Sequence, residues 1–274
     1  MPAARHAGMS LPEPDPQSTV LVTGASSGIG EELARQLAER GYNLVLVARR
    51  RERLEEMAGT LRARHGVAVD VDDAAVGDPA QRDGLVATLR EGERAVVGVC
   101  NNAGFSTYGR FQDIDPEHER EQVRVNVDAV HDLTGAFVPT MIDRGEGAIL
   151  NVASTAAFQP LPYQATYAAT KAFVLAFSEA VHTDLTGTGV SCTALCPGPT
   201  RTEFTEVAGM GEFEKTPDLF WQSAADVARD AIVGMLAGRR TVLPGVMNKA
   251  SANAGRLAPR SVLLPVMRAV WGRG

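Results

Sequence analysis

Tyr167 and Lys171 stand four residues apart in a stretch with helical periodicity, and Ser154 lies thirteen residues before the tyrosine. Positions i and i+4 share one face of a helix, so the phenol and the ammonium group are expected to be neighbours. A nearby cation favours the phenolate and lowers the tyrosine pKa from its usual value of about 10. The pattern predicts a tyrosine that works as a general acid or base near neutral pH, with the Ser154 hydroxyl holding the same substrate oxygen.

The roles of Tyr167, Lys171 and Asn126 each have an alternative explanation. Tyr163 is a competing tyrosine, but the residue four positions after it is Tyr167 rather than a cation. A surface Tyr–Lys pair would also produce the spacing of Tyr167 and Lys171. Asn126 is a polar residue in an apolar helical stretch, where a structural asparagine bonded to the backbone fits the pattern as well as a catalytic one.

The glycine-rich stretch TGASSGIG at residues 23–30 is the second candidate for chemistry. It follows the apolar run Val20–Val22 and precedes leucines and alanines at helical spacing, which predicts a strand, a turn and a helix. Backbone N–H groups in such a turn, together with the positive end of the helix dipole, bind anions. The spacing G-x-x-x-G-x-G differs from the commonest dinucleotide fingerprint, and an ordinary Gly/Ser turn is the alternative.

Arginines follow the second predicted strand, which ends at Val47. Arg49 and Arg50 stand where a dinucleotide site usually has an acidic residue for the ribose 2′-OH. Positive charge at a helix start opposes the helix dipole, so an anion bound among the arginines is the favoured explanation. A ribose 2′-phosphate fits and predicts NADP(H), whereas a solvated basic turn is the alternative.

The run Asn101-Asn102-Ala103-Gly104 comes directly after the predicted strand Val96–Cys100. Amides and a glycine at the carboxyl end of a parallel strand line the crevice where ligands bind in such sheets. An Asn/Gly turn without ligand contacts is the alternative.

Seven short apolar runs alternate with longer stretches of helical periodicity, and no internal repeat is present. The predicted strands cover 20–22, 43–47, 67–71, 96–100, 148–151, 190–195 and 241–243. The predicted helices cover about 28–40, 51–64, 79–91, 117–143, 164–185 and 225–238. Strands with little alternation, separated by helices, indicate βαβ units and a parallel sheet covered on both faces. We therefore expect one α/β domain over residues 18–245, after a flexible N-terminal extension at 1–17.

The composition is that of an ordinary soluble globular protein, with 45% hydrophobic and 22% charged residues. The formal net charge of −6 argues against nucleic acid as the main partner. Cys100, Cys192 and Cys196 lie in or beside apolar runs and are expected to be reduced core cysteines, with no metal site. No apolar run reaches the ~18 residues of a membrane span and no signal-peptide pattern is present, so we expect a cytoplasmic protein.

Residues 246–274 form a basic C-terminal extension. After Asp230 the chain has no acidic residue but carries seven basic ones, and the apolar stretch 261–271 contains Arg268. We expect a helical segment that packs on the domain or on a second subunit of a homo-oligomer. Weak contact with a membrane surface is the alternative.

The joint occurrence of TGASSGIG, NNAG, Asn126, Ser154 and YAATK at 167–171 resembles the short-chain dehydrogenase/reductases. The resemblance covers residues 23 to about 202. It implies a Rossmann-like, doubly wound domain with a seven-stranded parallel sheet in the order 3-2-1-4-5-6-7. It also implies that Tyr167 donates the proton to the carbonyl and that Ser154 polarises it. Lys171 would bind the nicotinamide ribose, and Asn126 would support the lysine through water.

The resemblance and the patterns above together assign the residues that bind NADP(H). They are Gly24, Ser26, Ser27, Gly28, Ile29, Gly30, Arg49, Arg50, Val76, Asn101, Ala103, Gly104, Tyr167, Lys171, Pro197, Gly198, Thr200 and Thr202. One departure concerns the adenine: where the family often has an aspartate after the third strand, this chain has Ala75. Adenine contact would then rest on backbone groups of Val76, or on Asp73 in another register.

We therefore expect an NADP(H)-dependent oxidoreductase that interconverts an alcohol and a carbonyl on an apolar small molecule. The segments expected beside the nicotinamide offer mostly apolar side chains, namely Phe158, Leu161, Tyr163, Phe204, Met210, Phe213, Phe220 and Trp221. The alternatives are a non-catalytic NADP-binding sensor or scaffold on the same fold and a peripheral membrane lipid reductase. The intact acid–base set disfavours the scaffold, because a scaffold needs no proton transfer.

Overall fold

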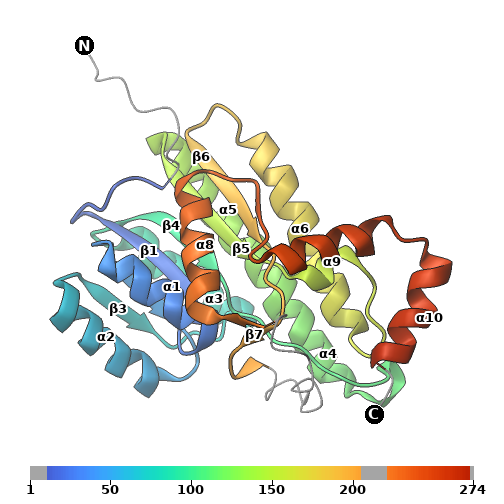
Figure 1. Ribbon diagram of the computed structural model, residues 1–274. Helices are drawn as coiled ribbons and strands as arrows, with labels where there is room; N and C mark the ends of the chain where they lie inside the picture. Colours follow the sequence, from blue (N-terminus) through green and yellow to red (C-terminus); the bar gives the residue numbers. More distant parts are fainter. Residues whose placement is uncertain (1–10, 205–220, 272–274) are drawn as a thin grey trace.

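The computed structural model describes residues 11–204 and 221–271, and a parallel sheet lies at its centre (Figure 1). Its strands are β1 (Ser18–Thr23), β2 (Leu44–Val47), β3 (Val69–Asp72), β4 (Ala95–Asn101), β5 (Gly147–Val152), β6 (Val190–Leu195) and β9 (Thr241–Val242). Their order is β3-β2-β1-β4-β5-β6-β9, and β9 is the seventh strand of this sheet. The predicted α/β class, the parallel sheet and the strand order are confirmed.

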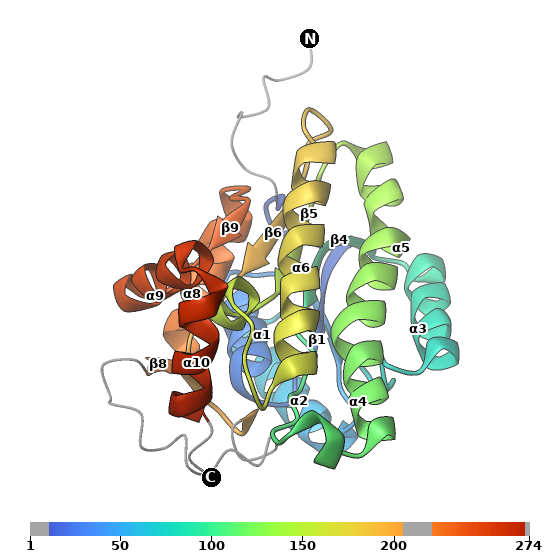
Figure 2. The same cartoon turned by 90° about the vertical axis from the view of Figure 1, so that its right-hand side faces the viewer.

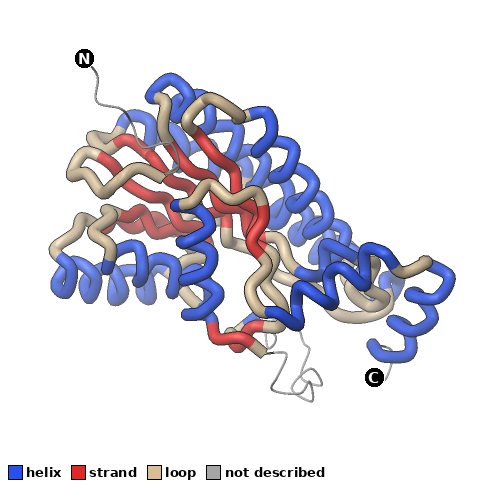
Figure 3. Tube along the Cα trace, turned by 45° about the horizontal axis from the view of Figure 1, so that its top comes forward, coloured by secondary structure: helices blue, strands red, loops and turns tan. Residues whose placement is uncertain are grey.

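Helices cover both faces of the sheet, which lies between them in Figure 3. One face carries α1 (Gly28–Glu39), α2 (Arg51–His65) and α8 (Ala224–Leu236). The other carries α3 (Pro79–Glu91), α5 (Ala129–Arg144) and α6 (Ala165–Asp184), which lie side by side in Figure 2. The helix predicted over 117–143 is divided, because α4 (Pro116–Val123) joins α5 through one π-helical turn, η2 (Arg124–Asp128).

Successive residues of β1 point to opposite faces of the sheet, as the pleat of a strand requires. Val20 and Val22 pack with Leu33 of α1, whereas Leu21 packs with Phe137 of α5. A strand buried on both faces needs apolar residues at nearly every position. This double burial explains why the strands appear in the sequence as apolar runs without alternation.

The packed domain begins before residue 18. Leu11 is fully buried, and the Tyr42 hydroxyl donates a hydrogen bond to the Pro12 carbonyl at 2.9 Å. Gly98 of β4 leaves room for the leucine, since a Cβ at this glycine would lie 2.9 Å from Leu11 Cδ1. The expectation of a flexible extension is therefore wrong for residues 11–17, and residues 1–10 lie outside the described part of the chain.

The C-terminal extension consists of α9 (Val246–Leu257) and α10 (Arg260–Trp271), with residues 272–274 outside the described range. α9 contacts η3 (Thr155–Phe158), a 3₁₀ turn that follows β5.

A two-stranded ladder of β7 (Thr200–Arg201) and β8 (Gln222–Ser223) lies between β6 and α8 in the chain. A short 3₁₀ turn, η1 (Phe111–Asp113), precedes α4. Within the described ranges, no helix is long and apolar enough to span a membrane.

Candidate active site

The carboxyl ends of the strands open into a cavity of about 1610 Å³. Its wall is built from the loops that follow β1 to β6, from α6 and from the C-terminal helices. All the site residues predicted from the sequence line this cavity except Gly30, Asn101 and Asn126. The topology therefore brings motifs from residue 24 to residue 202 into one place.

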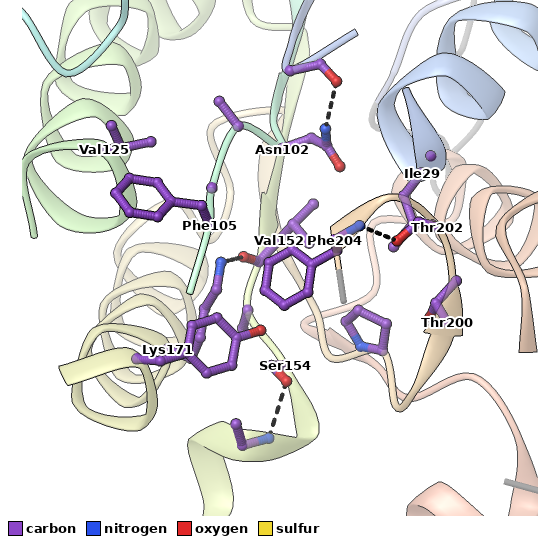
Figure 4. Close-up of a pocket in the computed structure, with 18 of the residues that line it drawn as sticks. Ile29, Asn102, Phe105, Val125, Val152, Ser154, Lys171, Thr200, Thr202 and Phe204 are labelled. Carbon is purple, nitrogen blue, oxygen red and sulfur yellow. Dashed lines mark hydrogen bonds between the residues drawn. The ribbon is translucent and has the colours of Figure 1, made fainter. Parts of the chain in front are cut away.

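Ser154 and Tyr167 meet at one end of the cavity. Ser154 is the N-cap of η3, and its Oγ accepts a hydrogen bond from the Ala156 N–H at 3.1 Å (Figure 4). Tyr167, in the first turn of α6, is 9% exposed and shares a hydrogen bond with Ser154. Tyr163 instead stacks on Tyr108, with ring centroids 6.0 Å apart. The structure therefore selects Tyr167 over Tyr163 as the partner of Ser154.

Lys171 lies one helical turn beyond Tyr167, with its Nζ 5.8 Å from the tyrosine ring centroid. Nζ donates a hydrogen bond to the Val152 carbonyl at 2.8 Å (Figure 4). Burial lowers the pKa of Lys171 to about 8 and raises the pKa of Tyr167 to about 12. The expected lowering of the tyrosine pKa is therefore wrong for this structure, because burial of the phenol outweighs its hydrogen bond with Ser154.

Asn126 lies in η2 and is fully buried. Its Oδ1 accepts from the Phe105 N–H at 3.1 Å, and its Nδ2 donates to the Phe105 carbonyl at 3.0 Å and to Thr170 Oγ1 at 3.2 Å. These contacts match the interpretation of an asparagine bonded to the backbone. A Cβ at Gly104 would lie 3.0 Å from Asn126 Oδ1 and 3.3 Å from Lys171 Nζ, so the amide and the ammonium group face the same glycine.

The glycine turn after β1 forms a cradle that fits an anion. Gly24 and Gly28 have φ values of +65° and +60°, in the left-handed region that favours glycine. A Cβ at Gly28 would lie 2.9 Å from Thr202 Cγ2, so a side chain there would fill the cradle. The side chain of Ser27 does not cap α1, which leaves the first N–H groups of this helix to the cavity. Gly30 packs instead against the Gly24 backbone and Asn102.

The two asparagines after β4 have different roles. Asn101 is buried, and its Nδ2 donates to Asn151 Oδ1 at 2.8 Å and to Thr134 Oγ1 at 3.2 Å. The expectation that Asn101 binds the cofactor is therefore corrected, because its side chain is used inside the sheet. Asn102 lines the cavity and donates to the Thr23 carbonyl at 3.0 Å. Its place in the same motif is the signal that could have identified it.

Arg49 and Arg50, which follow β2, differ in their contacts and exposure. Arg50 Nη2 donates to Ser26 Oγ at 2.9 Å and to Ser27 Oγ at 2.8 Å, which places the guanidinium against the glycine turn. Arg50 Nη1 lies 2.7 Å from a carboxylate oxygen of Glu203. The Arg49 side chain is 75% exposed, and its nearest acidic partner is Glu121 at 3.6 Å. Arg50 is therefore the better placed of the two for an anion at the turn.

The loop after β3 contains both candidates for adenine contact, Val76 and Asp73. Ala75, Val76 and Gly77 line the cavity, and the Val76 carbonyl accepts from Arg82 Nη1 at 2.7 Å. Asp73 is not among the lining residues, and its carboxylate lies 3.4 Å from Arg51 Nη1. The geometry favours Val76.

The end of the cavity near Tyr167 is apolar. Leu161, Phe204 and Trp221 line the cavity as predicted, whereas Phe158 and Tyr163 do not. Met210, Phe213 and Phe220 lie outside the described residues. The sequence patterns did not indicate the C-terminal lining residues, which are Asn248, Ala254, Gly255, Ala258, Leu263 and Met267. The apolar character of residues 261–271 was the available signal.

The described residues offer no evident site for metal or thiol chemistry. In the part of the chain that the structure describes, no cluster of three or more His, Cys, Asp or Glu could hold a metal ion. Cys100, Cys192 and Cys196 are free and buried, as expected, and burial raises the pKa of each thiol to about 12. Such thiols are weak nucleophiles at neutral pH.

Comparison with known proteins identifies the family to which the chain belongs. The family model of the short chain dehydrogenases matches residues 18–212. Sulfoacetaldehyde reductase from Chromohalobacter salexigens is 41% identical over 216 residues, covering 77% of this chain and 83% of that protein. A short-chain dehydrogenase from Sphingobium yanoikuyae in complex with NADPH is 34% identical with a TM-score of 0.80, covering 90% of this chain and 95% of that one. The bulky-bulky ketone specific alcohol dehydrogenase from Comamonas testosteroni is 28% identical with a TM-score of 0.74, covering 94% of each chain. The chain belongs to the short chain dehydrogenase family.

Proposed function

We propose that this protein is an NADP(H)-dependent oxidoreductase that interconverts an alcohol and a carbonyl on an apolar small molecule. The observation that carries the proposal is one cavity with Ser154, Tyr167 and Lys171 at one end and the glycine turn with Arg50 at the other. A solved relative in complex with NADPH supports the cofactor, and reductase relatives support the reaction class.

The side chains have separate roles in this proposal. When bound, the nicotinamide supplies or accepts the hydride at the reacting carbon. Ser154 and Tyr167 hold the substrate oxygen between their hydroxyl groups. With a pKa of about 12, Tyr167 keeps its proton at neutral pH and can donate it to the carbonyl oxygen during reduction. Lys171, charged below about pH 8, stabilises the tyrosinate that forms.

In the proposal, Asn126 positions Lys171 through hydrogen bonds to its neighbours. It ties Phe105, in the loop after β4, to Thr170, the residue before Lys171. The amide thereby keeps the lysine and Gly104 in register. A water bridge from Asn126 to the ammonium group remains part of the proposal.

The cavity wall supports an apolar substrate. Leu161, Phe204, Leu263 and Met267 line the cavity, and Phe204 and Met267 pack against the cluster that contains Tyr167. Among the described lining residues, the arginines follow β2 or belong to η2, and Lys171 is the remaining basic residue. Lys171 is already bonded to Val152, so among the described lining residues near Tyr167 no cation is left for a small sulfonate. We therefore infer a bulky ketone rather than sulfoacetaldehyde as the substrate.

A carbonyl screen tests the proposal. The purified protein would be mixed with NADPH and with an aryl alkyl ketone, a long aliphatic aldehyde or sulfoacetaldehyde, and the loss of NADPH absorbance followed. We expect turnover with the bulky apolar carbonyls. Turnover with sulfoacetaldehyde alone would contradict the substrate class. Tight NADPH binding without turnover on any carbonyl would favour the non-catalytic sensor.

The exposed face of α10 supports a second proposal, which concerns assembly and location. Val262 and Val266 are 60% and 53% exposed, with Arg260 and Arg268 on the same helix. We propose a cytoplasmic homo-oligomer in which this face meets another subunit, with weak contact to an anionic membrane surface as the competing role. Sedimentation and flotation with phosphatidylserine vesicles separate the two. A monomer that does not float would contradict both.

A further inference from the structure

Glu203 bridges two of the arginines that follow β2. One carboxylate oxygen lies 2.7 Å from Arg50 Nη1, and the other lies 2.7 Å from Arg53 Nη1. The hydrogen bonds from these arginines hold the pKa of Glu203 below its ordinary value, so the carboxylate is charged at neutral pH. Arg50 also bonds Ser26 and Ser27 of the glycine turn. An internal anion therefore already occupies the guanidinium groups beside the cradle.

The position of Glu203 in the chain connects this ion pair to the catalytic end. Thr202, the preceding residue, lies against Gly28. Phe204, the following residue, has its ring centroid 5.6 Å from that of Tyr167, and its N–H donates to Thr202 Oγ1 at 3.2 Å (Figure 4). Three consecutive residues thus touch the turn, the arginines and the catalytic tyrosine. A displacement of Glu203 would therefore also move Thr202 and Phe204, to which it is bonded in the chain.

We propose that Glu203 is a specificity-determining residue, an internal anion that must leave Arg50 when a ribose 2′-phosphate binds there. The inference rests on the proposed use of NADP(H). Carboxylate and phosphate use the same guanidinium donors, and two anions at one guanidinium repel each other. The phosphate, with a charge of about −1.5 to −2, displaces the singly charged carboxylate. NADH has no 2′-phosphate and does not compete with Glu203 for Arg50.

The charge of Glu203 should therefore weaken binding of 2′-phosphorylated ligands and leave other nucleotides unaffected. Glu203→Gln keeps the length and the hydrogen-bonding atoms of the side chain and removes its charge. An exposed ion pair such as Arg50–Glu203 contributes about 0.2–1 kcal/mol, so freeing Arg50 corresponds to about a 1.4- to 5-fold gain in affinity. The gain should shrink at high salt, since the ion pairs are exposed.

Calorimetric titration of the full chain with 2′,5′-ADP and with ADP tests the inference without any substrate. We expect Glu203→Gln to bind 2′,5′-ADP tighter than the wild type and ADP equally well. Asp70→Asn is the matched control. Asp70 lies on β3, pairs with Arg94 and is not among the residues that line the cavity. This control should leave both affinities unchanged, and thermal unfolding checks that each variant is folded.

The outcomes separate this inference from the cofactor proposal. A wild-type preference for 2′,5′-ADP that Glu203→Gln leaves unchanged would overturn the inference alone. Weaker binding of 2′,5′-ADP by Glu203→Gln would also overturn it, since Glu203 would then orient Arg50 for the phosphate. A wild type that binds 2′,5′-ADP no better than ADP would overturn the cofactor proposal and the inference with it.

Discussion

Lys171 on α6 and Val152 at the end of β5 are joined by a hydrogen bond of 2.8 Å from Nζ to the backbone carbonyl. Ser154 follows Val152 by two residues, so one strand end positions both the ammonium group and the hydroxyl group around Tyr167. Burial at this point lowers the pKa of Lys171 and raises that of Tyr167. The two buried groups therefore titrate at different pH values, which the kinetics can resolve.

Replacement of Tyr167 by phenylalanine tests the acid–base assignment. Tyr167→Phe keeps the ring packing and removes the hydroxyl, so we expect NADPH binding to persist while turnover falls by about 10²-fold or more. Fluorescence titration and steady-state kinetics measure the two effects. Tyr163→Phe is the matched control and should change turnover much less. Wild-type turnover in Tyr167→Phe would show that another group moves the proton.

The pH profile of carbonyl reduction should follow Lys171. Its pKa in the folded protein, about 8, lies below the ordinary value of 10.5, so the ammonium group loses its charge as pH rises through about 8. Tyr167 remains protonated through this range, because its pKa is about 12. We expect kcat/KM for reduction to fall above about pH 8. Lys171→Arg, whose guanidinium stays charged, should lower the maximum but move this fall to higher pH.

A wild-type profile that is flat up to about pH 10 would contradict the role of Lys171, since an ordinary lysine titrates only there. Thermal unfolding at each pH is the control, because it separates loss of the charge from loss of the fold.

Arg50 should contribute more than Arg49 to discrimination between the two nicotinamide cofactors. Arg50 lies against Ser26 and Ser27, whereas Arg49 is largely exposed. A charge-assisted hydrogen bond contributes about 1.5–3 kcal/mol, so Arg50→Ala should weaken NADPH at least about tenfold and leave NADH nearly unchanged. Arg49→Ala should have a smaller effect. Fluorescence titrations at low and high salt measure both, and equal loss of NADPH and NADH would contradict the prediction.

Met267 should affect the substrate rather than the cofactor. Its side chain lines the cavity and packs against the Tyr167 cluster, so Met267→Ala removes apolar contact at that end. We expect KM for a bulky ketone to rise about threefold to tenfold, with NADPH affinity unchanged. Leu264→Ala on the same helix is the control, because Leu264 is 41% exposed and lies outside this cavity. Equal effects of the two substitutions would show that α10 acts through stability alone.

Local patterns in the sequence were sufficient to predict the strands, the glycine turn and the shared helix face of Tyr167 and Lys171. Helical spacing places a tyrosine and a lysine on one face, and a strand followed by a glycine turn and a helix makes an anion cradle. These relationships depend on backbone geometry within a few residues. They can therefore be recognised without knowing which distant segments pack together.

Tertiary packing decided the remaining features. Asn101 and Asn102 are adjacent, and only the position of the neighbouring strand shows which of them faces the cavity. Arg50 and Glu203 are 153 residues apart, and Met267 reaches Tyr167 from the C-terminal helix. The raised pKa of Tyr167 also depends on what encloses the phenol. Burial and long-range contacts arise from the assembled fold, because they depend on which atoms displace water around each group.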